Sequence, residues 1–269
     1  MSDIYYLNTH NKRVDFIDDF PLEDIDSLFT SIYNNIINKN IISGFEQGIF
    51  DYTIKGELST KKINDIADVF YYDIKKNLRG RFYIGEYYML CNITGFSPES
   101  VNLTRSSLDT TLTITTDAPR WIRESYFNFY KFTYDEGTKE GFDYQYDYPY
   151  DYYADNKLGG ISNMNIDECE FKMEIFGPVV NPVIRIGGHL YNVNADLIKG
   201  ERLVIESLDK KIYKVKNNGE RINQFYLRNR DSDVFKKFEQ GYMSVYWDGT
   251  FGFDITLYEE RGEPKWLPL

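Results

Sequence analysis

The chain has 269 residues, of which 42% are apolar, and its 31 Lys and Arg against 42 Asp and Glu give a formal charge of −11. This length suits one large domain or two ordinary ones, and the absence of a Lys or Arg cluster argues against a nucleic-acid-binding protein. No apolar run approaches the ~20 residues of a membrane span, and the N-terminal segment lacks the charged-then-apolar pattern of a secretion signal. We therefore expect a protein made in the cytosol that binds neither membranes nor specific nucleic-acid sequences.

Two segments of the first half have the apolar spacing of amphipathic helices. The first is Asp24–Asn38, and the second is Lys61–Asn77. Thr60 is positioned to cap the start of the second segment, and Gly80 follows its end. Each segment places its apolar residues three or four apart, which predicts one buried stripe per helix.

Three further segments of the first half predict strands. Ile49–Leu58 alternates, Phe82–Ile93 is rich in aromatic residues, and Leu108–Thr116 places Leu and Ile on one side and Thr and Asp on the other. Strands interleaved with one or two helices indicate an α+β layout for this half.

An unusual tyrosine-rich segment lies in the middle of the chain. Phe142–Tyr153 holds six Tyr and three Asp. Because Tyr combines an apolar ring with a polar tip, such a segment is either a packed or interface strand, which we favour, or a ligand-contacting segment. Its Tyr148, Tyr150 and Tyr152 are candidates for contact with a glycan or a partner. We place the domain junction at 131–145, between a first domain of 1–130 and a second of 146–269.

The second half predicts strand after strand, separated by Gly, Pro and Asn turns. Gly187-Gly188 and Asp248-Gly249 leave gaps the size of hairpin turns, so we expect a β-sandwich or an open barrel. A short helix, Val234–Phe238, is predicted behind the capping residues Asp231, Ser232 and Asp233. The predicted strands are Glu170–Phe176, Pro182–Ile186, His189–Val193, Glu201–Glu206, Lys211–Lys216, Gln224–Arg228, Met243–Tyr246 and Asp254–Tyr258.

No catalytic, cofactor or metal motif is recognisable. The sequence has no GxSxG, HExxH or Walker loop, and Cys91 and Cys169 lie far from any metal-ligand spacing, so we expect two buried reduced thiols. His189 follows two glycines and is interpreted as a hairpin residue rather than a general base. Paired carboxylates such as Asp147 and Asp151 are too common among 42 acidic residues to indicate a glycosidase. Trp247 is either a sugar-stacking platform or, as we favour, a core anchor.

The motifs of the second half resemble those of one protein family. In the distal tail proteins of long-tailed phages, motifs of the same kind follow one another in the same order, and the resemblance is densest over Cys169–Leu267. The first half matches more loosely, through the second predicted helix, the strand pair after it and the segment Leu112–Glu124. The motifs are Ile175-Phe176-Gly177-Pro178 with Asn181-Pro182, Gly200-Glu201 with Ile205-Glu206-Ser207, and Arg261, Pro264 and Trp266 near the C-terminus.

The resemblance implies a mainly β protein with some α, in which an α+β ring-forming domain precedes a galectin-like β-sandwich. It implies a non-enzymatic component of the phage tail tip or baseplate, without cofactor, that is assembled in the host cytoplasm and ends in the virion. Its expected partners are five further copies in a hexameric hub ring, the tail tube protein, and tail-associated or tail fibre proteins. The alternative is a carbohydrate-binding module that recognises host cell-wall glycan.

Overall fold

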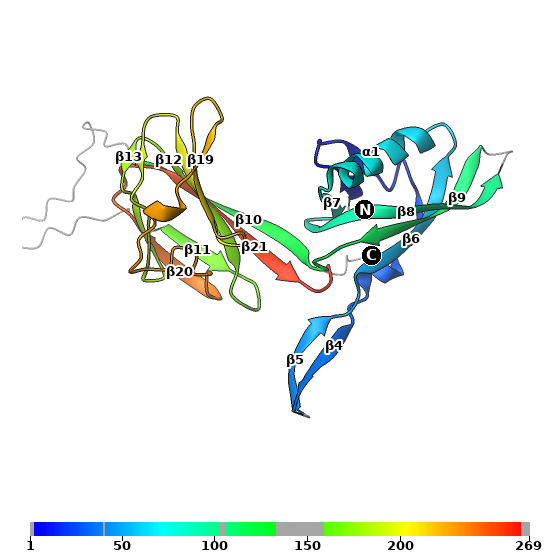
Figure 1. The fold of residues 1–269 in the computed structure, drawn as a ribbon, viewed down its shortest axis with the longest axis horizontal. Coiled ribbons are helices and arrows are strands. Elements are labelled where there is room, and N and C mark those ends of the chain that lie inside the picture. Colours follow the sequence, from blue (N-terminus) through cyan, green and yellow to red (C-terminus); the bar gives the residue numbers. More distant parts are fainter. Residues whose placement is uncertain (1–2, 40, 103–105, 133–158, 265–269) are drawn as a thin grey trace, which may run out of the picture. The chain divides into compact units, whose positions relative to one another are not determined.

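The computed structural model describes residues 3–39, 41–102, 106–132 and 159–264, and the chain forms two compact units (Figure 1). Unit 1 contains residues 1–124 and 260–269, and unit 2 contains residues 125–259. The described strand pairs are antiparallel and only one α-helix is found in the described ranges, so the prediction of a mainly β protein with some α is confirmed. None of the helices in these ranges is long and apolar enough to span a membrane.

Unit 1 is organised around one long strand, β8 (Tyr87–Asn102). The first part of β8 lies between β7 (Gly80–Ile84) and β10 (Trp121–Phe129), and β7 continues the sheet to β1 (Ile4–Leu7) and β2 (Arg13–Asp15). Beyond Asn92, the same strand pairs with β9 (Ser107–Thr115), which pairs with β6 (Asp51–Ser59) and through it with β3 (Leu22–Asp24). Register shifts at Ile93/Gly95 and Pro98/Ser100 bend β8.

The helix α1 (Ile63–Lys76) covers the core of unit 1 with Ile66, Val69 and Phe70. It confirms the second predicted helix, but its caps differ from the prediction. Lys62 occupies the N-cap, and the Thr60 hydroxyl instead donates to the carbonyl of Ser106. Asn77 ends the helix in the left-handed conformation, with φ 52°, which Asn tolerates better than most residues.

The first predicted helix, Asp24–Asn38, is wrong. The segment forms the end of β3, a 3-10 turn η1 (Asp26–Phe29) and the strand β4 (Tyr33–Asn38), which pairs with β5 (Ile41–Gln47). Among the apolar residues Ile25, Leu28, Phe29, Ile32 and Ile36, which have helical spacing, only Leu28 is fully buried, whereas Ile32 and Ile36 are exposed. Asn and Ile are poor helix formers, and the matching run Ile41–Gln47 offers β4 a partner across a tight turn.

The other predictions for the first half agree with the strands found. Ile49–Leu58 corresponds to β6 and Leu108–Thr116 to β9, while Phe82–Ile93 is a hairpin of β7 and β8 that turns at Gly85, with φ 58°. Strands β1, β2 and β10 were not predicted.

Unit 2 consists of two main sheets around one core. The first sheet has the order β19 (Arg221–Asn223), β18 (Lys211–Val215), β17 (Arg202–Glu206), β12 (Glu170–Phe176) and β21 (Phe253–Arg261). The second has the order β11 (Gly159–Asn163), β20 (Gly241–Tyr246), β14 (Val183–Ile186) and β15 (His189–Asn192), and a small pair joins β13 (Val179–Val180) to β16 (Asp196–Leu197). Alternate residues of β12, β14, β20 and β21 fill a common hydrophobic cluster, as in a sandwich.

Two predictions for the second half are wrong. Gln224–Arg228 is a 3-10 turn, η2 (Phe225–Leu227), because the Asn223 side chain accepts a hydrogen bond from the backbone N–H of Phe225 and turns the chain. Val234–Phe238 is not a helix, because Phe238 exchanges backbone hydrogen bonds with Cys169 and so extends the chain. Of the remaining predicted strands, Glu170–Phe176 is found with the predicted bounds, and the others differ by one to three residues at their ends.

The boundary between the units falls within two strands, β10 and β21, whose ranges include residues 124/125 and 259/260. The chain thus passes from unit 1 to unit 2 in β10 and returns in β21. The predicted boundaries at 130 and 146 stay a prediction, since most of the predicted junction and the segment Phe142–Tyr153 lie outside the described residues.

Candidate functional site

The structure places a serine beside the only histidine that the sequence analysis weighed as a base. Ser232 Oγ lies 3.3 Å from His189 Nε2, but that nitrogen is 2.8 Å from the backbone carbonyl oxygen of Asp233. A carbonyl oxygen only accepts, so Nε2 carries the proton and is no base toward Ser232. The Ser232 hydroxyl itself donates to the carbonyl of Leu190 at 2.5 Å. The pair therefore holds the β14–β15 hairpin against the 231–234 turn.

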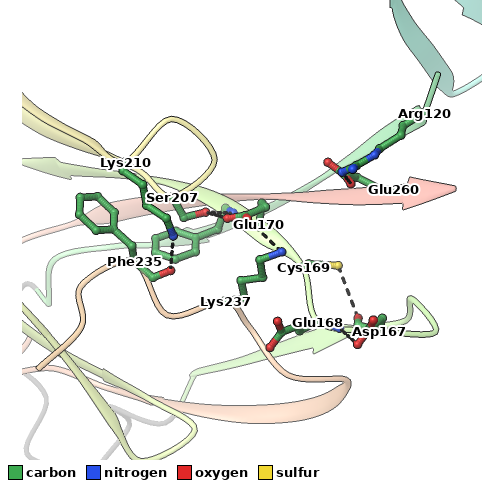
Figure 2. A network of polar contacts seen from close by, with 11 residues as sticks. Arg120, Asp167, Glu168, Cys169, Glu170, Ser207, Lys210, Phe235, Lys237 and Glu260 are labelled. Carbon is green, nitrogen blue, oxygen red and sulfur yellow. Dashed lines mark hydrogen bonds and ion pairs between the residues drawn. The ribbon is translucent and has the colours of Figure 1, made fainter. Parts of the chain in front are cut away.

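A cluster of charged residues in unit 2 is likewise internally satisfied (Figure 2). Glu170 accepts a hydrogen bond from Ser207 Oγ at 2.5 Å and forms an ion pair with Lys237 Nζ at 3.0 Å. Ser207 Oγ in turn accepts from the backbone N–H of Phe171 at 2.7 Å. This network ties the start of β12 to the turn after β17 and leaves no carboxylate poised for acid–base work.

The described ranges hold no cluster of three His, Cys, Asp or Glu side chains suited to a metal. Neither Cys91 nor Cys169 forms a disulfide, and both are buried. Burial raises the pKa of the Cys91 thiol well above its usual value, so that the unreactive protonated form predominates. The expectation of two buried, reduced cysteines agrees with this geometry.

The predicted contact residues are not brought together in the described part of the chain. Tyr148, Tyr150 and Tyr152 lie outside it. Trp247 is only 9% exposed, and its indole N–H donates to the carbonyl of Phe251 at 3.0 Å. Its ring stacks on Phe132 and meets Phe129 edge-on, which is the core-anchor role favoured from the sequence.

Unit 1 exposes several large apolar residues on the hairpin of β4 and β5, which projects from the rest of the unit (Figure 1). Ile37 is 65% and Ile41 71% exposed, and the hairpin carries only two charged residues, Lys39 and Glu46. A contiguous apolar surface of this kind marks an interaction site or invites aggregation. The exposed large apolar residues of the hairpin and its root are Ile32, Tyr33, Ile36, Ile37, Ile41 and Ile42.

Unit 1 also has an apolar groove of about 410 Å³. It is formed where β1, the chain after β2 and the region of β3 come together, and Glu23 is its one charged lining residue. The apolar lining residues are Ile4, Phe16, Ile17, Pro21, Leu22 and Ile25.

On unit 2, the outer face of β20 presents two tyrosines four residues apart. Tyr242 is 72% exposed, and a Cβ built on Gly160 would lie 2.2 Å from its ring, so the ring lies across that glycine. Tyr246 stands opposite Arg185 of β14. These rings are available to a partner or a sugar, whereas Trp247, which follows the end of β20, is buried.

The sequence analysis missed the hairpin, although a signal was present. Ile36-Ile37 and Ile41-Ile42 flank a short polar turn, which is the symmetric pattern of a hairpin. The groove gave no such signal, because its lining residues come from separate elements.

No family model matches the sequence, and no curated protein matches it. Solved structures do. A protein in the baseplate of phage P2 in its activated conformation with Ca has 15% identity and a TM-score of 0.62, covering 98% of this chain and 100% of that chain. A protein in the phage p2 baseplate with Sr has 14% identity and a TM-score of 0.61, with the same coverage of both chains. The Dit protein of phage SPP1, described as a hub of the adsorption apparatus, has 8% identity and a TM-score of 0.55, covering 96% of this chain and 99% of that chain.

At these identities the likeness concerns the fold, and it extends over nearly the whole length of each chain. The resemblance noted in the sequence is therefore confirmed at the level of structure: the chain has the fold of phage baseplate and Dit hub proteins.

Proposed function

We propose that this chain is a structural, non-enzymatic component of a phage tail tip, in which six copies form a hub ring through unit 1. The observation that carries this proposal is the β4–β5 hairpin, whose exposed isoleucines are not covered by any described residue of the same copy. The fold shared with baseplate and hub proteins supports the setting. In this proposal the ring joins the tail tube to tail-associated or fibre proteins carried by unit 2.

The physical reason lies in the stability of a two-stranded ribbon. Such a ribbon is at best marginally stable alone in water, and one rich in isoleucine adds an exposed apolar surface to that cost. Burying its side chains in an assembly lowers the free energy by about 25 cal/mol for each Å² of apolar surface removed from water. The hairpin therefore has a lower free energy in an assembly of copies than in a single chain.

Negative-stain electron microscopy of the purified protein tests the proposal. Six-fold rings with a central hole support it. Particles that remain single chains at every concentration would count against it.

A second candidate function is the recognition of cell-wall glycan by unit 2. The specific observation in its favour is the pair of exposed rings Tyr242 and Tyr246 next to Arg185 on one sheet face. The predicted contacts Tyr148, Tyr150 and Tyr152 belong to this candidate as well. Binding of the intact protein to a cell-wall glycan array, lost in Tyr242→Ala but retained in Tyr226→Ala, would support it. Tyr226 serves as the control because it is 80% exposed, slightly more than Tyr242, but lies outside β20.

A further inference from the structure

The geometry points to a specific contact within the proposed ring: the β4–β5 hairpin of one copy lies in the apolar groove of the next copy. This inference rests on the proposed ring and names the two surfaces that would meet. It is carried by the two-sided apolar character of the hairpin, by the open edges of its strands, and by the composition of the groove.

The hairpin is apolar on both faces. Residues opposite each other in a ribbon share a face, and Ile37 lies opposite Ile42. Ile36 and Ile41 point to the other face, because their positions alternate with that pair. A flat surface would cover only one of these faces, whereas a groove covers both.

The strands of the hairpin also have free outer edges. In the described part of the chain, β4 pairs only with β5, and β5 only with β4. Open edges with exposed apolar side chains are templates for docking onto another chain. A partner can therefore contact the apolar side chains of the hairpin and also hydrogen-bond to its main chain.

The groove of unit 1 matches this occupant in polarity. Six of its seven lining residues are apolar, and its volume of about 410 Å³ is in the range of real binding pockets. A second depression on unit 1, of about 470 Å³, is lined mainly by polar residues such as Arg79, Asn92 and Asp117. Isoleucine side chains would leave those polar groups without water or partners, so the apolar groove is the better receiver.

Charge complementarity favours the same pairing. Lys39 lies at the turn of the hairpin and Glu23 lines the groove, and neither forms an ion pair within the described part of its own copy. A hairpin tip inserted into the groove of another copy brings these opposite charges toward each other.

The occupant is a second copy because each copy carries both this hairpin and this groove, and the described residues of a single copy leave both open. Ile37 is 65% and Ile17, in the groove, 38% exposed. Two different patches that complement each other form a head-to-tail contact, and such contacts close into rings when the rotation permits.

The test uses one charged substitution on each surface. Ile37→Glu places a charge on the apolar surface of the hairpin, and Ile17→Glu places one in the apolar groove, so each should prevent the contact from one side. Neither side chain belongs to the buried core of unit 1, since Ile37 is 65% and Ile17 38% exposed. Ile166→Glu on unit 2, at a residue that is 82% exposed, is the matched control. Light scattering gives the mass of each variant, alone and mixed.

The wild type and Ile166→Glu are expected to assemble, and the two unit 1 variants to remain single chains. Mixing the two variants restores one intact contact, so the mixture should form dimers and nothing larger. Separate copies carrying Ile37→Cys and Ile17→Cys should form a covalent dimer on oxidation, since the native cysteines are buried.

Normal assembly of Ile17→Glu would overturn the inference, as would a mixture that stays monomeric or cysteine copies that fail to cross-link. In each of those cases an assembling wild type leaves the proposed ring intact. A wild type that is itself monomeric would instead defeat the proposed ring.

Discussion

A buried carboxylate joins α1 to the N-terminal strand of unit 1, and its removal should destabilise that unit. Asp73 is fully buried and accepts hydrogen bonds from the Tyr6 hydroxyl at 2.7 Å and from the Thr9 backbone N–H at 3.1 Å. The Thr9 hydroxyl also donates to it. Burial, followed by the hydrogen bond to Asp73, raises the pKa of Tyr6 far above its usual value, so the phenol stays protonated and donates.

Asp73→Ala removes the one acceptor that the described residues provide for the Tyr6 hydroxyl and leaves that group buried without this partner. Hydrogen bonds to a charged group contribute about 1.5–3 kcal/mol, and an orphaned buried donor costs about 1–3 kcal/mol. Thr9 is exposed and can turn to water, so the expected loss in unfolding free energy is about 3 kcal/mol rather than the full sum. Tyr6→Phe, which leaves the carboxylate its Thr9 donors, should cost less.

Hydrogen exchange read by mass spectrometry resolves the effect by unit. Amides of α1 and β1 should exchange roughly a hundredfold faster in Asp73→Ala, since each 1.36 kcal/mol is a factor of ten. Peptides of unit 2 should be unchanged. Asp68→Ala, an exposed site on the same helix, should change exchange little. The reasoning is refuted if Asp73→Ala behaves like Asp68→Ala, or if the double variant with Tyr6→Phe costs the sum of the two singles.

Three more predictions concern unit 2. Gly249→Ala should lower its melting temperature, because φ is +73° and the new Cβ would lie 1.9 Å from the Phe132 ring, whereas Gly219→Ala, at a φ of +83° in open space, should lower it less. Trp247→Ala should cost about 3–5 kcal/mol in urea unfolding, as for other large buried aromatics, and a cost below ~1 kcal/mol would contradict the core-anchor role. The backbone N–H of Ile198, assisted by Lys214, lowers the pKa of Glu201, so its stabilisation is present above the unfolded-state pKa and lost as pH falls through the folded one. The stability difference between the wild type and Glu201→Gln should therefore shrink as the pH falls below the unfolded-state pKa of about 4.3, and a difference independent of pH would speak against it.

Those parts of the fold that depend on local pattern could be predicted from the sequence. The spacing from Ile63 to Ile74 specifies α1, and the alternation in β6, β9 and β12 specifies strands. The segment Asp24–Asn38 could not be assigned in this way, because its apolar spacing fits a helix while its pairing depends on residues that follow it. Pairing with the next segment of the chain overrides the local periodicity here.

The candidate site was less accessible to sequence reasoning than the fold. The tyrosine-rich segment attracted notice by composition, whereas the exposed isoleucines of the hairpin resemble ordinary core residues until their lack of cover is seen. The groove depends on Ile4, Phe16 and Ile25 meeting in space, and no sequence spacing encodes that meeting. The burial of Trp247, in contrast, could be predicted from the sequence, because large aromatic residues are usually buried.

The central claim, that the exposed apolar surface of unit 1 serves self-association, is tested most directly by the mass of the intact protein in solution. Light scattering across a range of concentrations should give six times the 31.8 kDa of one chain. A mass of one chain throughout that range would contradict the account.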